Sequence, residues 1–338
     1  MHTLLLGNGL NRLSAAVDWA ELLRLLVDEF DVGHLVQHMD QKPLSMLFEE
    51  LCAHCGGKSF RGAERSVKTK IASLVGSVMV NELHRQYAAP FDVILTTNYD
   101  DTLERAISGP MFTRAHMYAE SRYSLFRRCR AANKDVWHIH GDSTLPESIV
   151  LGFDHYAGYL QKIRNYFTDG IRISSEAHPI RSPIKSGATD FERWGRTYSW
   201  ADHFLRDHLH IVGLGLDFTE IDIWWLLLHK RRRKIVTGRT FYYDVNVLGS
   251  ASSPKPQLSV LRSLGVDVQE VPARTYHEGY VAILDLITAN TRRYPSLLQP
   301  AQPLRDDQPA SAELEIGPEG LRAAQLKLPM RRARKRLK

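Results

Sequence analysis

The chain has 338 residues, of which 43% are hydrophobic and 24% charged, and its formal net charge is +6. This length allows one large domain or two ordinary ones, and the composition is that of a soluble globular protein. The 3 cysteines are too few for a disulfide framework and fit a reducing compartment. No basic leader precedes a long apolar segment, and the apolar run at 221–228 is too short to span a bilayer. The sequence therefore predicts a cytoplasmic protein without membrane contact.

The first quarter of the chain predicts one short strand and then a long helical segment. Leu4–Leu6 is an apolar run that enters a turn at Gly7-Asn8-Gly9. Apolar residues recur at helical spacing from Trp19 to Phe30, and the whole segment of about 13–89 is expected to be mostly helical.

Strands and helices alternate along the rest of the chain. The further predicted strands are 91–97, 136–139, 210–213, 240–245 and 266–271, with one more apolar run at 149–152. The predicted helices are 101–107, 156–167, 198–208, 257–264 and 280–288, with a loop-rich basic stretch before Lys134 and turn formers at 182–190. Such alternation predicts an α/β fold in which helices cover both faces of a mostly parallel sheet.

One more helix is expected to begin near Thr219. The residues Thr219-Glu220-Ile221-Asp222 have the form of a capping box, which places a side chain on the free amides of the first turn. The basic run at 229–234 follows this helix, as is usual for cations at a helix carboxyl end.

The composition changes near the end of the chain. Prolines recur from Pro295 to Pro318, and the last residues, Arg331–Lys338, form a basic cluster. The sequence predicts a main domain at 1–291 and a flexible tail at 292–338. The cluster is a candidate for electrostatic contact with nucleic acid or an acidic partner.

Two glycine turns follow predicted strands. Gly7-Asn8-Gly9 comes after the first strand, and Gly213-Leu214-Gly215 comes after the strand at 210–213. Glycines there let a backbone approach a phosphate closely, and a helix amino end favours the phosphate's negative charge. A tight turn or close strand-to-helix packing without any ligand would need the same residues.

Three polar residues stand at the ends of predicted strands, where open α/β sheets bind their ligands. Asn98 can hold a ribose hydroxyl or a water molecule, and Asp100 can hold the loop or a second hydroxyl. His140 can take up a proton near neutral pH, and its place before a glycine predicts exposure to a cleft. The alternatives are turn and capping roles for the first two residues and a structural role for the histidine.

Two patterns raise the question of a metal site. Cys52 and Cys55 have the spacing of zinc ligands but lack a second pair, so ordinary thiols are favoured. His138 and His140 fall on one face of a predicted strand, with Asp142 as the nearest third ligand. We expect no metal. A nucleophilic hydrolase is disfavoured as well, because the Gly-x-Ser-x-Gly elbow is absent.

Taken in chain order, four motifs resemble the nucleotide-site motifs of the sirtuin superfamily: Gly7-Asn8-Gly9, Thr97-Asn98-Tyr99-Asp100, His140-Gly141 and Gly213-Leu214-Gly215. The sequence is most similar to bacterial sirtuin-like domains of anti-phage defence, including the Thoeris effector type, which carry a segment similar to Ile149–Tyr156. The resemblance covers 1–291 and implies a Rossmann-like fold. It implies that Asn98 and His140 are catalytic. It implies nucleotide contacts for Gly7, Gly9, Asp100, Gly213 and Gly215, and the same loops add Asn8, Asn11 and Asp217.

The chain also departs from the sirtuin pattern in two places. Residues 10–15 lack the Pro-Asp-Phe-Arg stretch that encloses nicotinamide in sirtuin deacylases, and the four-cysteine zinc module is absent. Both departures argue against protein deacylation. The resemblance then implies an NAD+ hydrolase that releases nicotinamide and ADP-ribose and acts in abortive infection, gated by a homo-oligomer or a partner protein. The alternatives are a non-catalytic module that binds NAD or ADP-ribose, an NAD-dependent deacylase, and a nucleic-acid-associated protein.

Overall fold

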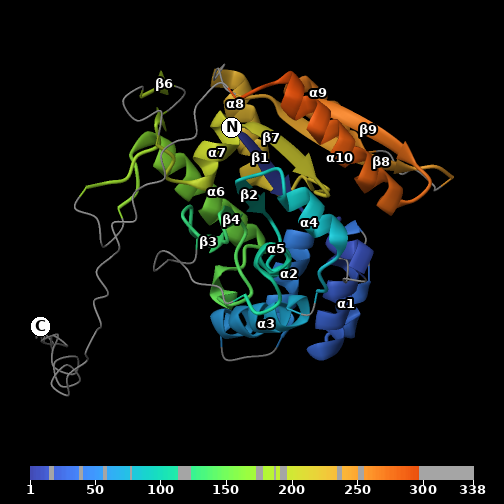
Figure 1. Cartoon of the computed structure of the whole chain (residues 1–338). Coiled ribbons are helices and arrows are strands. Elements are labelled where there is room, and N and C mark those ends of the chain that lie inside the picture. Colours follow the sequence, from blue (N-terminus) through green and yellow to red (C-terminus); the bar gives the residue numbers. More distant parts are fainter. Residues whose placement is uncertain are drawn as a thin grey trace, which may run out of the picture. The chain divides into compact units, whose positions relative to one another are not determined.

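A computed structural model of the chain describes residues 1–14, 19–37, 41–55, 59–76, 78–112, 123–172, 178–185, 188–190, 196–233, 238–249 and 255–296 (Figure 1). The predicted tail from residue 297 onward lies outside these residues, and so do parts of the segment 13–89 and residue 234 of the basic run. The boundary at residue 291 and the basic cluster at 331–338 therefore stay predictions. None of the described helices is both long and apolar enough to cross a membrane.

Seven strands of the described residues form one sheet in the order β3-β4-β2-β1-β7-β8-β9. They are β1 (His2–Leu6), β2 (Val93–Thr96), β3 (Arg128–Ala131), β4 (Lys134–His138), β7 (His208–Val212), β8 (Thr240–Val247) and β9 (Asp267–Ala273). Neighbouring strands of this sheet are parallel, except that β3 runs antiparallel to β4 at the edge. The predicted α/β, Rossmann-like fold is confirmed.

Each face of the sheet is buried under its own layer of helices, because side chains alternate along the strands. Leu5, Leu95 and Ile211 pack under one layer, formed by α6 (Phe153–Thr168), α7 (Trp200–Arg206), α8 (Ile221–Arg233) and α9 (Pro256–Ser263). Leu4 and Ile94 pack under the other, formed by α4 (Glu82–Ala88), α5 (Thr102–Ser108) and α10 (Tyr276–Arg293).

The predicted helical segment builds a third core beside the sheet. Its helices are α1 (Trp19–Glu29), α2 (Leu44–His54) and α3 (Phe60–Val75), which Figure 1 shows grouped together in blue. Their apolar side chains pack against Tyr99 from the loop after β2 and against Ile149 and Leu151. This helical insertion therefore braces two loops at the carboxyl ends of the strands.

Two stretches differ from the sequence prediction. The basic stretch expected to be a loop contains the edge strand β3, and the turn-rich stretch contains the short pair β5 (Ile184–Lys185) and β6 (Ala188–Thr189). The apolar run at 149–152 is extended but lies outside the named strands, and the Val150 amide donates to the His140 carbonyl at 2.8 Å. It is apolar because Val150 packs into the core under α6, while Ile149 and Leu151 pack into the core of the insertion.

The strand order defines a topological switch point between β1 and β7. From β1 the chain continues to β2 and β4 on one side, and β7 leads to β8 and β9 on the other. The loops that follow such a strand pair separate and leave a crevice at the carboxyl ends, where α/β proteins bind ligands. The two predicted glycine turns follow these two strands.

Candidate active site

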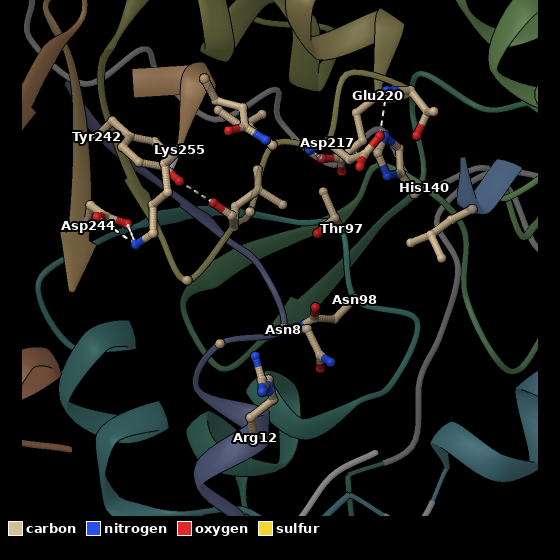
Figure 2. Close-up of a pocket in the computed structure, with 18 of the residues that line it drawn as sticks. Asn8, Arg12, Thr97, Asn98, His140, Asp217, Glu220, Tyr242, Asp244 and Lys255 are labelled. Carbon is tan, nitrogen blue, oxygen red and sulfur yellow. Dashed lines mark hydrogen bonds and ion pairs between the residues drawn. The ribbon is translucent and has the colours of Figure 1, made fainter. Parts of the chain in front are cut away.

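A cavity of about 590 Å³ lies at the switch point, within the range of about 300–1,000 Å³ usual for small-molecule sites (Figure 2). Its walls come from the loops after β1, β2, β4 and β7, from the middle of β8, and from parts of α2, α6, α9 and α10. Seven predicted site residues line it: Asn8, Gly9, Asn98, His140, Gly213, Gly215 and Asp217. The other three, Gly7, Asn11 and Asp100, are not among its described lining residues.

The two glycine turns are joined through their backbones. The Gly7 amide donates to the Val212 carbonyl at 2.9 Å, and the Gly9 amide donates to the Gly213 carbonyl at 2.8 Å. Gly213 has a φ of +63°, a conformation that side-chain-bearing residues rarely adopt. A Cβ on Gly9 would lie 2.7 Å from the Gly213 Cα. Glycine is therefore needed for the contact between the turns, with or without a phosphate above them.

Asn98 is held at the cavity wall by three hydrogen bonds. Its backbone amide donates to Thr96 Oγ1 at 3.0 Å, and its side-chain Nδ2 donates to the Gly7 carbonyl at 3.3 Å. The Asn98 carbonyl accepts from His138 Nδ1 at 2.9 Å. Because a carbonyl can only accept, the bond to Gly7 fixes which end of the Asn98 amide is the donor.

Asn11 and Asp100 brace the loops behind the cavity. Asn11 Nδ2 donates to Asp100 Oδ2 at 2.8 Å, and Asp100 Oδ1 accepts from the Thr102 amide at 3.0 Å. The His84 ring donates through Nε2 to Asn11 Oδ1 at 2.9 Å and accepts from the Asn81 amide. Burial lowers the pKa of His84 to about 4, so the ring stays neutral in this role. These bonds tie the first glycine turn to the loop after β2.

His140 is paired with a buried carboxylate. Its Nε2 lies 2.9 Å from Asp222 Oδ2, and the two residues are 2% and 0% exposed. Burial lowers the pKa of His140, but the charge and hydrogen bond of Asp222 raise it more, so the net direction is upward. A carboxylate can only accept, so Nε2 carries the proton and Nδ1 is left as the basic nitrogen. The expected exposure of His140 is wrong, although the residue does line the cavity.

The predicted capping box at Thr219–Asp222 is also wrong. α8 begins at Ile221, and the reciprocal bonds belong to the preceding loop: the Asp217 amide donates to Glu220 Oε2 at 3.0 Å, and the Thr219 amide donates to Asp217 Oδ1 at 2.8 Å. This earlier turn leaves Asp222 to face His140. Asp222 Oδ1 accepts no hydrogen bond from the described residues.

Glu220 adds another acidic group at the His140 end of the cavity. Figure 2 shows Glu220, Asp217 and His140 together at that end. Burial, with the negative charges of Asp222 and Asp217, raises the pKa of Glu220 to about 7, against an opposing effect of His140. This end of the cavity can therefore hold a positive charge.

The prediction that His138 and His140 lie on one face of a strand is wrong, because β4 ends at His138 and the two side chains bond partners on different helices. His138 Nε2 bonds Glu104 Oε1 on α5 at 2.7 Å, whereas His140 bonds Asp222 on α8, and these helices cover opposite faces of the sheet. Burial raises the pKa of the Cys52 thiol to about 12, which disfavours the thiolate that zinc requires. Among the described residues, no cluster of three or more histidine, cysteine, aspartate or glutamate side chains could hold a metal.

The sequence analysis missed several lining or supporting residues: Arg12, Tyr156, Glu220, Asp222, Asp244 and Lys255. Most of them stand alone on a helix, in a strand or in a turn, where no neighbouring residue marks them. Asp222 is 82 residues from His140 in the sequence, and its neighbours fit an ordinary helix start. The one usable signal was the cluster of acids directly after the second glycine turn.

An α/β sheet of Rossmann order, with an open cavity at its switch point, defines a class of nucleotide-binding domains. Comparison with known proteins narrows that class. A family model described as a SIR2-like domain matches residues 92–221, which run from β2 to the first residue of α8 and include Asn98, His140 and the second glycine turn. This part of the chain is similar to SIR2-like domains, and the predicted resemblance to sirtuin-like proteins is confirmed.

The chain is also similar to a protein named NAD(+) hydrolase ThsA, from Acinetobacter baumannii (strain 532279). The two are 25% identical over 154 residues, which is 45% of this chain and 30% of that protein. The similarity therefore spans less than a third of the relative's length.

Proposed function

We propose that this protein hydrolyses NAD+ at the bond between nicotinamide and ribose, giving nicotinamide and ADP-ribose. The observation that carries the proposal is that Asn98 and His140 line one cavity together with both glycine turns, at the switch point of a SIR2-like sheet. The name of the similar protein, NAD(+) hydrolase, supports the same reaction.

The chemistry of this reaction fits the His140 end of the cavity. When the C1′–N bond breaks, its electron pair goes to the nicotinamide nitrogen, and positive charge develops on the ribose ring. Ionised carboxylates near such a charge stabilise the transition state more than the ground state. Asp217 and Glu220 line this end, and Asp222 lies behind His140.

His140 and Asn98 have separate parts in the step. Water forms the new bond to C1′, and its proton passes to Nδ1 of His140 and then to solvent. Asp222 accepts from Nε2 of the same ring, so it fixes the tautomer and stabilises the charged ring. The Asn98 amide, fixed by its bond to Gly7, positions the water or a ribose hydroxyl. The pyrophosphate lies over the two glycine turns. The Gly7 and Gly9 amides already bond the Val212 and Gly213 carbonyls, so these glycines help by letting the backbone come close to the phosphates and not by donating those two hydrogen bonds.

A cytoplasmic NAD+ hydrolase would exhaust its own cell, so the proposal includes control of the activity. We propose an effector of anti-phage defence that is held inactive until it forms a homo-oligomer or meets a partner protein. The helical insertion is the candidate surface, because its core packs against Tyr99 and Leu151, which both line the cavity.

Product analysis tests the reaction. Purified protein is incubated with NAD+ over a range of protein concentrations, and nicotinamide, ADP-ribose and cyclic product are separated chromatographically. Nicotinamide with ADP-ribose supports hydrolysis, and cyclic product would mean transfer within the substrate. If the protein binds NAD+ but releases no nicotinamide, either when purified or in cells infected by phage, it is a binding module and not a hydrolase.

Two variants show whether the proposed residues carry the reaction. Asn98→Ala and His140→Ala should abolish nicotinamide release while the circular dichroism spectrum stays that of the wild type. Undiminished turnover in both variants would overturn the assignment.

A further inference from the structure

The end of the cavity away from His140 holds a second pair of charged residues. Lys255 Nζ lies 2.7 Å from both carboxylate oxygens of Asp244. Asp244 belongs to β8 and is 9% exposed, while Lys255 directly precedes α9. Both residues line the cavity, and Figure 2 shows them together with Tyr242, apart from His140 and Glu220.

The layout of the cavity gives this end to the adenosine half of the substrate, which rests on the proposed function. With nicotinamide at His140 and the pyrophosphate over the two glycine turns, the adenosine continues toward Asp244 of β8 and Lys255. The elements that carry or contact the pair, β8, α9 and α10, contribute five more lining residues to the cavity: Tyr242, Gln257, Leu258, Tyr276 and Tyr280. This wall combines apolar and aromatic surface for a base with one carboxylate for ribose hydroxyls.

We infer that Asp244 and Lys255 together read the substituent on the 2′ oxygen of the adenosine ribose, and that they make the protein prefer NAD+ over NADP+. Dinucleotide sites generally accept a free 2′-hydroxyl with an acidic residue at a strand end, and a 2′-phosphate with a basic one. Here both kinds of residue lie at one point, and each neutralises the other.

Charge decides which substrate the pair accepts. Asp244 can accept hydrogen bonds from ribose hydroxyls while Lys255 balances its charge. A 2′-phosphate, with a charge of about −1.5 to −2 at neutral pH, would be placed beside the Asp244 carboxylate. Lys255 cannot donate all of its N–H groups to the phosphate, because its ammonium group already bonds both Asp244 oxygens. Removing the charge of Asp244 should therefore release Lys255 to the phosphate.

Three variants test this reading. The ratio of kcat/KM for NADP+ to kcat/KM for NAD+ is measured for the wild type, Asp244→Asn, Lys255→Met and the double variant. Asp244→Asn should raise the ratio by about tenfold or more, and Lys255→Met should lower it. The double variant should lose the gain, since the released ammonium group is then missing. Asp135→Asn is the matched control. It breaks an ion pair with Arg130, whose atoms lie 2.8 Å apart and outside the described cavity lining, and it should leave the ratio unchanged.

Binding of the two products separates this inference from the proposed reaction. ADP-ribose and ADP-ribose 2′-phosphate carry the same 2′ groups and need no turnover, so their Kd values are measured by calorimetry on the same four proteins. Selective binding of ADP-ribose that Asp244→Asn reverses, without NAD+ cleavage, would support the inference and overturn only the reaction. A wild type that prefers the 2′-phosphate, a ratio that Asp244→Asn leaves unmoved, or no binding of either product would overturn the inference.

Discussion

The Nε2 atom of His140 lies 2.9 Å from Oδ2 of Asp222, and both side chains are buried beside the cavity. A buried histidine normally loses basicity, because burial penalises its charged form. The carboxylate reverses this effect and holds the pKa of His140 above its ordinary value. Asp222 is thus a positioning residue that keeps one nitrogen of the ring protonated and the other basic.

Asp222→Asn should lower kcat for nicotinamide release by at least about tenfold, because the variant loses the fixed tautomer and the stabilised imidazolium. The pH profile gives the diagnostic result. His140 acts as a base only when neutral, so activity rises as the pH passes through the pKa of its imidazole. Without the Asp222 charge that pKa falls, and the acidic limb of the kcat profile should move to lower pH.

The His138–Glu104 pair offers a matched control for this measurement. It also joins a histidine to a carboxylate, at 2.7 Å with both side chains fully buried, but neither residue is among the described lining of the cavity. Glu104→Gln should leave the acidic limb in place, even if it lowers thermal stability or lowers kcat through the bond between His138 and the Asn98 carbonyl. A limb that moves equally in both variants would mean that Asp222 acts only through the fold.

Glu220 should make substrate binding depend on pH near neutrality. Its pKa is about 7, raised mainly by burial, so the carboxyl group ionises as the pH rises through that value. Its negative charge then favours the cationic nicotinamide ring of NAD+. KM should therefore fall between about pH 6 and about pH 8. Steady-state kinetics of Glu220→Gln should show a flat KM over this range, and a wild-type KM that rises with pH would contradict the assignment.

The sequence predicted what depends on local pattern and missed what depends on distant partners. Apolar runs that end in glycines identified β1 and β7, and strand ends identified Asn98 and His140, because such signals lie within a few neighbouring residues. β3 was missed because four residues at a sheet edge alternate too briefly. The Asp244–Lys255 pair joins residues from two elements that only the folded sheet brings together.

The glycine turns should differ in how far they tolerate a methyl group. Gly9→Ala should lower the free energy of unfolding by about 1–3 kcal/mol, because its Cβ would lie 2.7 Å from the Gly213 Cα and the two backbones must separate. A Cβ on Gly215 would meet no atom within 4 Å, so Gly215→Ala should change the free energy of unfolding by less than about 0.5 kcal/mol. Thermal unfolding of both variants tests the contrast, and equal losses would argue against a tight contact at Gly9.

The helical insertion is joined to α6 by a buried charged cluster. Glu64 Oε1 lies 3.0 Å from Lys68 Nζ, which is on the same helix, and 2.9 Å from His155 Nε2 on α6. His155 Nδ1 accepts from the Gly152 amide at 2.9 Å, next to Leu151, which lines the cavity. Burial acts to raise the pKa of Glu64, but its bonds and charges with Lys68 and His155 outweigh burial and lower it.

Glu64→Gln should lower the free energy of unfolding at neutral pH by about 3 kcal/mol, because Lys68 is 1% exposed and loses the charge that Glu64 presents to it. Since folding depresses the pKa of Glu64, this stability is present above the pKa of the unfolded state and is lost as the pH falls through the folded value. Urea denaturation should therefore show a difference between wild type and variant that shrinks in acid. Glu82→Gln, from a pair with Arg85 whose side chains are 66% and 55% exposed, should change stability by less than about 0.5 kcal/mol. If Glu64→Gln and Glu82→Gln gave the same small change in the free energy of unfolding, the buried cluster would not be the contact that holds α3 against α6 and the cavity wall.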